Sequence, residues 1–334
     1  FEKQYSLKFN RKFGVAVSNG SVALDVAFKL LNLDKDDEVI VPSFTIISCL
    51  SAIIRSGGKP VFCDVNEESW NMSLEDVKSS FSEKTKAVLV VHTYGLAAEI
   101  IKIQEFCKEK NIYLIEDAAE AHGQKVNNKP CGSFGDISVF SFYANKHITT
   151  GEGGMVLTDS EEFYDNAQKI RNLDFNNVKR FSHDNLYWNY RLSGLQASLG
   201  ISQLKNMNRT IDLKIKQGNY YTELFSESKD LVQLPLKEHM GVINHYWVYG
   251  VLIKKENMRD FLMDELRNKG IETRPFFWPL HLQPALPDEY KTIKKLTVSE
   301  NLGLNGLYIP MGSHITKKLQ EKITTTILRI LKEN

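Results

Sequence analysis

The sequence predicts an α/β protein with a mostly parallel sheet in its larger part and a smaller α+β unit at its C-terminus. Short apolar runs alternate with helical patterns, which is typical of successive βαβ units. Polar or glycine-rich segments follow several of these runs, and open parallel sheets bind ligands at that end of their strands. After about residue 207 the pattern changes. We therefore expect a large domain over residues 1–207 and a small domain over residues 208–334.

The short apolar runs are rich in β-branched and aromatic residues, and we expect them as strands. In chain order they are residues 15–17, 39–41, 60–65, 87–91, 112–115, 137–142 and 155–158. Segments with apolar residues at helical spacing separate them or follow them. These expected helices are residues 1–11, 22–31, 46–56, 74–81, 98–110, 160–172 and 194–204.

The remaining elements complete the small domain. We expect a loop over residues 175–186, a long helix over 210–225, a strand over 246–253, a helix over 257–269, a strand over 271–277 and a helix over 316–332. The sequence begins at Phe1 inside a helical pattern and without an initiator methionine, so we expect that further residues precede it.

Composition and charge exclude several classes of function. The 334 residues are enough for a large core, and the net charge is +1. Runs of lysine and arginine are missing, which argues against a nucleic-acid partner. Cys49, Cys63, Cys107 and Cys131 have neither metal-ligand spacing nor the pattern of a disulfide framework, so we expect no metal and a reducing cytoplasm. No apolar run reaches the roughly 18 residues of a membrane span.

A lysine directly after an apolar strand is the predicted chemical centre. Residues 138–142 form the strand, Lys146 follows it, and residues 151–154 are a glycine-rich turn. Near the start of the chain, Gly20 and Ser21 precede a helix, whose free N–H groups are a suitable cradle for a phosphate. Taken alone, each feature has an ordinary explanation, since many lysines lie at the surface and many serines only cap a helix.

Other polar residues follow neighbouring strands. Asp117 comes directly after the run over residues 112–115, Ser141 lies at the end of its own run, and His92 follows an earlier one. Since the carboxyl ends of parallel strands share one edge of the sheet, we expect these side chains near Lys146.

A lysine, an aspartate and a phosphate cradle together suggest pyridoxal 5'-phosphate (PLP). The PLP aldehyde forms a Schiff base with a lysine amine, and its pyridine nitrogen stays protonated beside a carboxylate. The freed lysine can then move a proton, which burial assists by lowering its pKa.

At these residues the chain closely resembles the sugar-nucleotide aminotransferases of the DegT/DnrJ/StrS type. The resemblance implies a fold-type-I PLP transferase related to aspartate aminotransferase, and it covers nearly the whole chain. The segments that carry it are residues 18–21, 42–45, 92–95, 116–120, 141–146, 149–154, 188–191, 274–277 and 279–281.

This family resemblance implies roles for individual residues. Lys146 would bind PLP and transfer the proton, Asp117 would pair with the pyridinium nitrogen, and Glu120 would lie near the ring hydroxyl. Gly20, Ser21 and Ser141 would bind the phosphate. Asn189 would reach the phosphate of a neighbouring subunit, so the active sites would be shared within a homodimer.

Substrate contacts are also implied by the resemblance. His92, Arg191, Phe276 and His281 are the candidates. Arg191 would bind the carboxylate of the amino donor or only brace its loop, and core packing is an equal alternative for Phe276 and His281.

Two departures from the family pattern affect the pocket. Many relatives have an aromatic residue that stacks on the cofactor ring where Ile46 stands here. About one helical hairpin of N-terminal sequence, which lines the substrate pocket in the family, is absent.

Within the family, residues 145–154 and 272–277 look most like the branch that makes perosamine. The implied reaction transfers an amino group from L-glutamate to C4 of GDP-4-keto-6-deoxy-D-mannose, for O-antigen or other surface polysaccharides. Transfer to a UDP- or dTDP-linked 4-keto or 3-keto sugar is the alternative.

Other classes stay open. A sugar dehydratase of the same fold has histidine in place of the lysine, so Lys146 argues against it, although His147 is adjacent. A non-catalytic regulator would not need the lysine and the aspartate. A Rossmann dehydrogenase would need a Gly-x-Gly-x-x-Gly motif after its first strand, which is missing.

Overall fold

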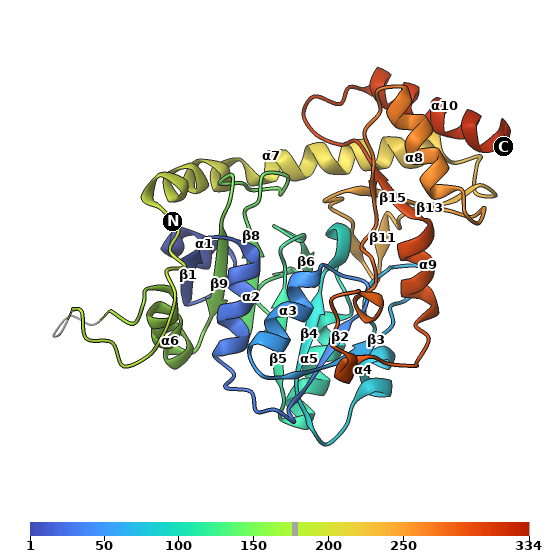
Figure 1. Cartoon of the computed structure of the whole chain (residues 1–334). Helices are drawn as coiled ribbons and strands as arrows, with labels where there is room; N and C mark the ends of the chain where they lie inside the picture. The colour runs from blue at the N-terminus through green and yellow to red at the C-terminus, as the bar shows by residue number, and fades with distance from the viewer. Residues whose placement is uncertain (176–179, 334) are drawn as a thin grey trace.

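The computed structural model describes residues 1–175 and 180–333, so part of the predicted loop over residues 175–186 lies outside the described residues. Its centre is a seven-stranded sheet in the order β1-β9-β8-β5-β4-β2-β3 (Figure 1). The strands are β1 Phe13–Val17, β2 Glu38–Pro42, β3 Lys59–Cys63, β4 Thr85–Val91, β5 Tyr113–Asp117, β8 Ile137–Ser141 and β9 Gly154–Thr158. β2 to β5 and β8 pair in parallel, whereas β9 is antiparallel to both of its neighbours. The predicted mostly parallel α/β architecture is therefore confirmed.

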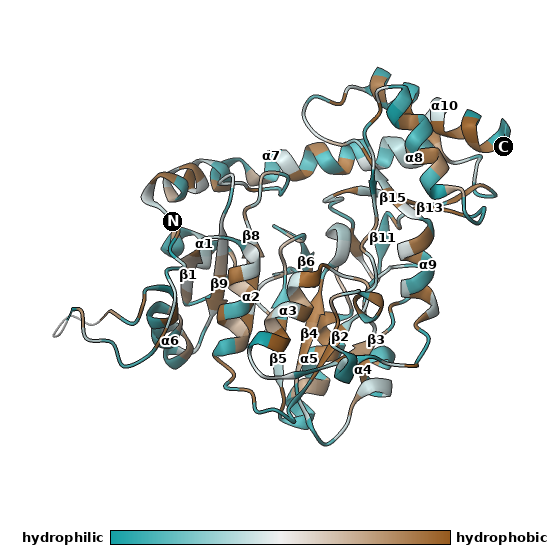
Figure 2. Cartoon of the chain, in the orientation of Figure 1, coloured by the Kyte–Doolittle hydropathy of each residue, from teal (hydrophilic) through white to brown (hydrophobic). Residues whose placement is uncertain are grey.

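Helices cover both faces of this sheet. They are α1 Glu2–Lys8, α2 Gly20–Lys29, α3 Ile47–Arg55, α4 Leu74–Ser80, α5 Ile100–Lys110 and α6 Glu161–Arg171, with the short helix η1 Thr93–Gly95 and the hairpin β6 Lys125–Val126 and β7 Lys129–Pro130. Alternate residues of one strand point to opposite faces. On β2, Val39 and Val41 pack in the cluster that contains α2 and α3, and Ile40 packs with α4 and α5. Figure 2 shows the resulting concentration of hydrophobic residues along the central strands.

A single helix, α7 Gly194–Leu224, runs from the large sheet into the C-terminal part (Figure 1). The sequence predicted two separate helices over residues 194–204 and 210–225, and this prediction is wrong. The residues between them contain neither proline nor glycine. Leu204, Met207 and Ile211 continue the helical spacing and pack in one cluster with α1. The predicted domain boundary at residue 207 therefore falls inside α7.

The C-terminal part is built on a four-stranded antiparallel sheet in the order β10-β13-β15-β14. Its strands are β10 Val232–Gln233, β13 Tyr249–Ile253, β14 Arg274–Pro275 and β15 Gly306–Ile309, and β11 Glu238–His239 pairs separately with β12 Val242–Ile243. Its helices are α8 Arg259–Asn268, α9 Thr297–Asn305 and α10 Lys317–Glu333, with the short helices η2 Leu280–Leu282 and η3 Asp288–Tyr290. The predicted strand over residues 271–277 is reduced to two residues. Among the described helices, none has the length and apolar character to cross a membrane.

Candidate active site

Lys146 lies in the turn that follows β8, where its N–H donates to the carbonyl of Tyr143 at 3.0 Å. Its side chain is only 9 % exposed, and its Nζ atom lies 3.6 Å from Oε1 of Glu120. Burial lowers the pKa of the Lys146 amine, while Glu120 and Asp117 act in the opposite direction. A buried amine with a lowered pKa loses its proton more readily, as a nucleophile or proton carrier requires.

Asp117 is the last residue of β5, between β4 and β8 at the carboxyl edge of the parallel strands. Its Oδ1 accepts the N–H of Ala119 at 3.0 Å, and the thiol of Cys49 lies 3.6 Å from its Oδ2. Burial raises the pKa of Asp117, and the charge of Lys146 opposes this rise. The carboxylate is therefore near the lysine and only weakly satisfied by the protein.

Glu120 completes this group of charged residues. Its Oε2 accepts the N–H of Tyr94 at 2.8 Å, and the residue is buried. Burial raises the pKa of Glu120 to about 7, although the charge of Lys146 lowers it. The structure thus brings together the lysine and two carboxylates that the sequence placed at one edge of the sheet.

The expected phosphate cradle is formed by α2 against the end of β8. Asn19 caps α2 by accepting the N–H of Val22 at 2.9 Å, which leaves the N–H groups of Gly20 and Ser21 at the helix start. A Cβ atom on Gly20 would lie 2.7 Å from Cβ of Ser141, so only glycine permits this approach. The Ser21 hydroxyl is exposed and lies 2.6 Å from Oγ of Ser48, which the sequence analysis did not single out. Three hydroxyl groups and a helix N-terminus fit a phosphate.

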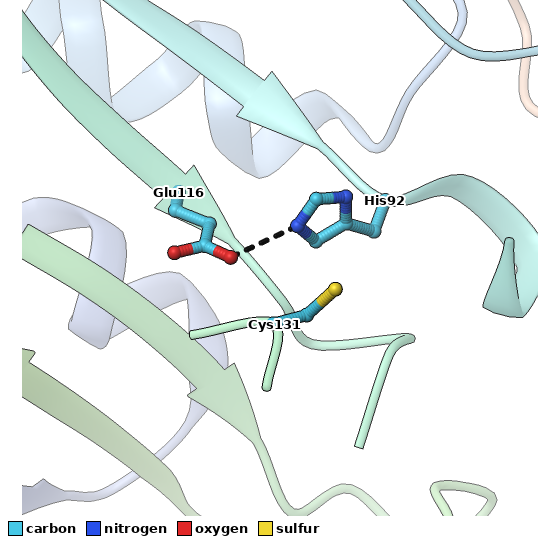
Figure 3. A group of neighbouring side chains, drawn as sticks. All are labelled: His92, Glu116 and Cys131. Atoms are coloured by element: carbon cyan, nitrogen blue, oxygen red, sulfur yellow. Dashed lines mark hydrogen bonds and ion pairs between the residues drawn. The ribbon is translucent and has the colours of Figure 1, made fainter. Parts of the chain in front are cut away.

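His92 does not lie with this group. Figure 3 shows that its ring points to Glu116 and lies beside Cys131. Its Nε2 is 3.0 Å from Oε1 of Glu116, its Nδ1 accepts the N–H of Ala98 at 3.2 Å, and the residue is fully buried. Both ring nitrogens are used inside the protein, so the structure offers neither of them to a substrate.

The side chains of His92, Glu116 and Cys131 place possible metal-ligand atoms within 4.8 Å of one another. The two oxygens of Glu116 are nevertheless occupied. They accept hydrogen bonds from His92, from the Ser138 hydroxyl and from the backbone N–H groups of Gly132, Phe134 and Gly135. A metal would have to displace several of these donors, so we interpret the cluster as a structural network.

Asn189 and Arg191 lie on an exposed segment beside β1. Arg191 Nη1 donates to Oδ1 of Asn172 at 2.6 Å, and Asn189 forms a backbone bridge with the same residue. Within one chain, Arg191 therefore braces its segment, which was one of its two expected roles.

Phe276 and His281 are buried. Phe276 packs in the aromatic cluster with Phe44 and Tyr94. His281 Nδ1 lies 2.6 Å from the Ser43 hydroxyl, and its Nε2 lies 3.3 Å from Glu300. These contacts favour the packing alternative for both residues.

Three positions could not be read correctly from the sequence. Ile46 precedes α3 and is 42 % exposed, so it covers less of the interior than its apolar side chain suggested. Trp247 lies against Lys146, with Nζ 3.6 Å from the ring centroid, and Cys49 lies under Asp117. The only signal of either contact was an apolar residue in an apolar segment, which is the ordinary pattern of a core.

The fold and the site define a PLP-dependent transferase, because a buried lysine, a buried aspartate and a helix N-terminus meet at the carboxyl edge of a parallel sheet. The profile of the DegT/DnrJ/EryC1/StrS aminotransferase family matches residues 1–328, and the chain belongs to this family. PLP is accordingly its cofactor, and the family and cofactor predictions are confirmed.

Known relatives and solved structures agree with this assignment. The chain is 40% identical over 289 residues to GDP-perosamine synthase of Vibrio cholerae, covering 85% of this chain and 77% of the relative. It is 37% identical over 310 residues to GDP-perosamine synthase of Escherichia coli O157:H7, covering 93% and 83%. A DegT/DnrJ/EryC1/StrS aminotransferase from Brucella abortus matches with a TM-score of 0.89 and 28% identity, covering 98% of this chain and 88% of that chain. A mutant GDP-4-keto-6-deoxymannose-3-dehydratase with bound GDP-perosamine matches with a TM-score of 0.89 and 25% identity, covering 98% and 91%.

Proposed function

We propose that this aminotransferase moves an amino group from L-glutamate to C4 of GDP-4-keto-6-deoxy-D-mannose and so makes GDP-perosamine. The similarity to two proteins named GDP-perosamine synthase supports the sugar. For the reaction type, the observation that carries the proposal is the buried Lys146 amine beside Glu120, with its pKa lowered by burial. Bound PLP supplies the electron sink that aminotransferase chemistry needs.

The residues of the chain have distinct tasks in this proposal. Lys146 binds the cofactor and then carries a proton to and from the reacting carbon. The Asp117 carboxylate holds the proton of the pyridine nitrogen. Glu120 lies near the ring hydroxyl, and its pKa of about 7 lets it exchange a proton near neutral pH. The N–H groups of Gly20 and Ser21 orient the phosphate.

We further propose a homodimer with shared sites, in which Asn189 reaches the phosphate held by the partner subunit. Asn189 is exposed, and several large apolar side chains near it in the sequence are exposed as well. Leu186 is 96 % exposed, Trp188 55 % and Leu195 85 %. An apolar surface of this kind is typical of a protein interface. In such a dimer Arg191 would also be available to the carboxylate of L-glutamate.

The same proposal places the enzyme in the cytoplasm, where nucleotide sugars are modified before their use in O-antigen, lipopolysaccharide or another surface polysaccharide. His92, Phe276 and His281 are left out of the proposed substrate contacts, because packing and hydrogen bonds inside the chain already account for them.

A second candidate is amination of a UDP- or dTDP-linked keto sugar. A dTDP-4-dehydro-2,3,6-trideoxy-D-glucose 4-aminotransferase of Saccharopolyspora spinosa is 31% identical over 312 residues. The similarity is lower than to the GDP-perosamine synthases, which favours the GDP-linked sugar.

A panel of GDP-, UDP- and dTDP-linked 4-keto and 3-keto sugars, each incubated with L-glutamate and PLP, tests the proposal. Mass spectrometry of the products should show an amino group gained only, or at least tenfold faster, on the GDP-linked 4-keto sugar. Faster amination of a UDP- or dTDP-linked sugar would overturn the substrate. Loss of water without a gained amino group would identify a dehydratase, and inactivity with every sugar would favour a regulator.

A further inference from the structure

Trp247 lies against the Lys146 amine, although it belongs to the segment that leads into β13 in the C-terminal part of the chain. Nζ of Lys146 is 3.6 Å from the centroid of the indole. An ammonium group over an indole face is attracted by the negative potential of the ring, and the attraction increases when water is excluded. Trp247 is 6 % exposed and the Lys146 side chain 9 %, so this contact is shielded from water.

Three hydrogen bonds fix the position of Trp247. Its Nε1 donates to the carbonyl of Asn145 at 3.1 Å, directly before Lys146. Its backbone N–H donates to the carbonyl of Tyr94 at 3.1 Å, and its own carbonyl accepts from Nζ of Lys214 at 2.9 Å. The indole is therefore tied to the lysine turn, to the segment after β4 and to α7, and it forms a fixed wall of the site.

A lysine side chain has a flexible stem, and its amine can occupy many positions when nothing restrains it. Here the amine is restrained on two sides, by the Trp247 ring and by the Glu120 carboxylate 3.6 Å away. Both contacts favour the ammonium form. The carboxylates were expected from the sequence, whereas the aromatic wall was not.

We propose that Trp247 is a positioning residue for Lys146, which holds the free amine in the site and stabilises its ammonium form. This inference rests on the proposed function, because it concerns the attachment of PLP and the proton transfer by the lysine. The amine is free before PLP attaches and again whenever it carries a proton. Loss of the indole should therefore lower kcat and leave the KM of the sugar nucleotide nearly unchanged.

Several titratable groups surround this contact. Asp117 at the end of β5, Glu120 and His122 after it, Lys214 of α7 and Tyr308 of β15 face Lys146 or Trp247. Burial lowers the pKa of the amine, and the two carboxylates raise it. The indole acts in the same direction as the carboxylates, so its removal should lower this pKa further.

Attachment of PLP to the cofactor-free protein measures that pKa directly. The neutral amine adds to the PLP aldehyde and one water leaves, and borohydride then reduces the C=N bond to a stable secondary amine. Initial rates of labelling at Lys146, followed by peptide mass spectrometry over a pH series, give the pH midpoint. We expect Trp247→Leu to lower this midpoint by about one unit and to lower kcat about tenfold, as the loss of a desolvated cation–π contact predicts. Trp247→Phe keeps an aromatic face and should shift the midpoint by about half as much.

Trp70→Leu is the matched control. Trp70 is 3 % exposed and lies in the same aromatic cluster as Trp247, where it packs against Phe276. It should keep the wild-type midpoint, and thermal unfolding shows which variants are folded. A wild-type midpoint in both Trp247 variants overturns the inference, and if Trp247→Leu does not fold, the Phe variant decides alone. Failure of the wild type to label at Lys146 would instead overturn the proposed function.

Discussion

Glu116 and Asp117 are adjacent on β5 and both buried, yet their surroundings are opposite. Glu116 accepts five hydrogen bonds, from two side chains and three backbone N–H groups. Asp117 accepts one backbone N–H and faces one thiol. Burial disfavours the charge of both, but the bonds from His92 and the backbone lower the pKa of Glu116 to about 2, whereas burial dominates at Asp117 and raises its pKa.

This difference separates structure from function along a single strand. Consecutive residues of a strand point to opposite faces, so one carboxylate enters the packed interior and the other reaches the edge beside Lys146. A fully bonded carboxylate stabilises the fold and has little capacity left for a ligand. A weakly bonded one retains that capacity, and the missing partner is the one that PLP supplies.

The largest expected effect is on folding, in Glu116→Gln. The amide offers one acceptor oxygen and turns two N–H groups toward donors that now meet a carboxylate. We expect the free energy of unfolding to fall by about 3–5 kcal/mol, as for other broken buried pairs. Urea unfolding of the cofactor-free protein measures it. A loss below about 1 kcal/mol would show that the network is dispensable.

Asp117→Asn makes the same chemical change one residue further along. Because the asparagine cannot hold the pyridine nitrogen protonated, kcat should fall by about 10²–10³. The free energy of unfolding should change by less than about 1 kcal/mol, because a poorly solvated charge is removed. Steady-state kinetics and urea unfolding of the same preparation test both parts, and equal losses in activity and stability would make this aspartate structural.

The two glutamates should also respond to pH with opposite signs. The pKa of Glu120 is raised to about 7 by burial, so its contribution to stability is complete below about 4.5 and is lost as the pH rises to 7. The pKa of Glu116 is lowered to about 2, so its contribution is complete above about 4.5 and is lost as the pH falls toward 2. The stability of wild type minus that of Glu120→Gln should therefore decrease from pH 4.5 to 7. A difference that stays flat in this window would contradict the shifted pKa.

The smallest effect is expected at the proposed subunit interface. Asn189→Ala should raise the dissociation constant of PLP about tenfold, the loss typical of one hydrogen bond to a charged group. Fluorescence titration of the cofactor-free protein measures it, with exposed Asn206→Ala on α7 as the control. An unchanged constant would remove the shared phosphate contact from the account.

Local patterns in the sequence predicted the sheet edge well. Asp117, Ser141 and Lys146 follow apolar runs, and the rule for parallel sheets places such residues together. The N-terminus of α2 was also readable, because Gly20 and Ser21 precede a periodic apolar segment.

Features that depend on distant residues were not readable. The donors that saturate Glu116 come from the loop after β7, and no local pattern shows that they turn toward β5. Trp247 lies about 100 residues after Lys146 in the chain. The continuity of α7 was missed because its polar centre resembles a linker, although Met207 maintains the buried spacing. His92 followed the same rule as Asp117, but its ring turned into the interior network.

The site of PLP attachment tests the central claim most directly. Lys214 is the natural competitor, because burial lowers the pKa of its amine to about 8 and it lies beside Trp247. Borohydride trapping of PLP on the wild-type protein, followed by peptide mass spectrometry, should place the label on Lys146. Lys146→Ala should show no label and no transamination while still binding PLP noncovalently. A label on Lys214, or turnover in Lys146→Ala, would contradict the account.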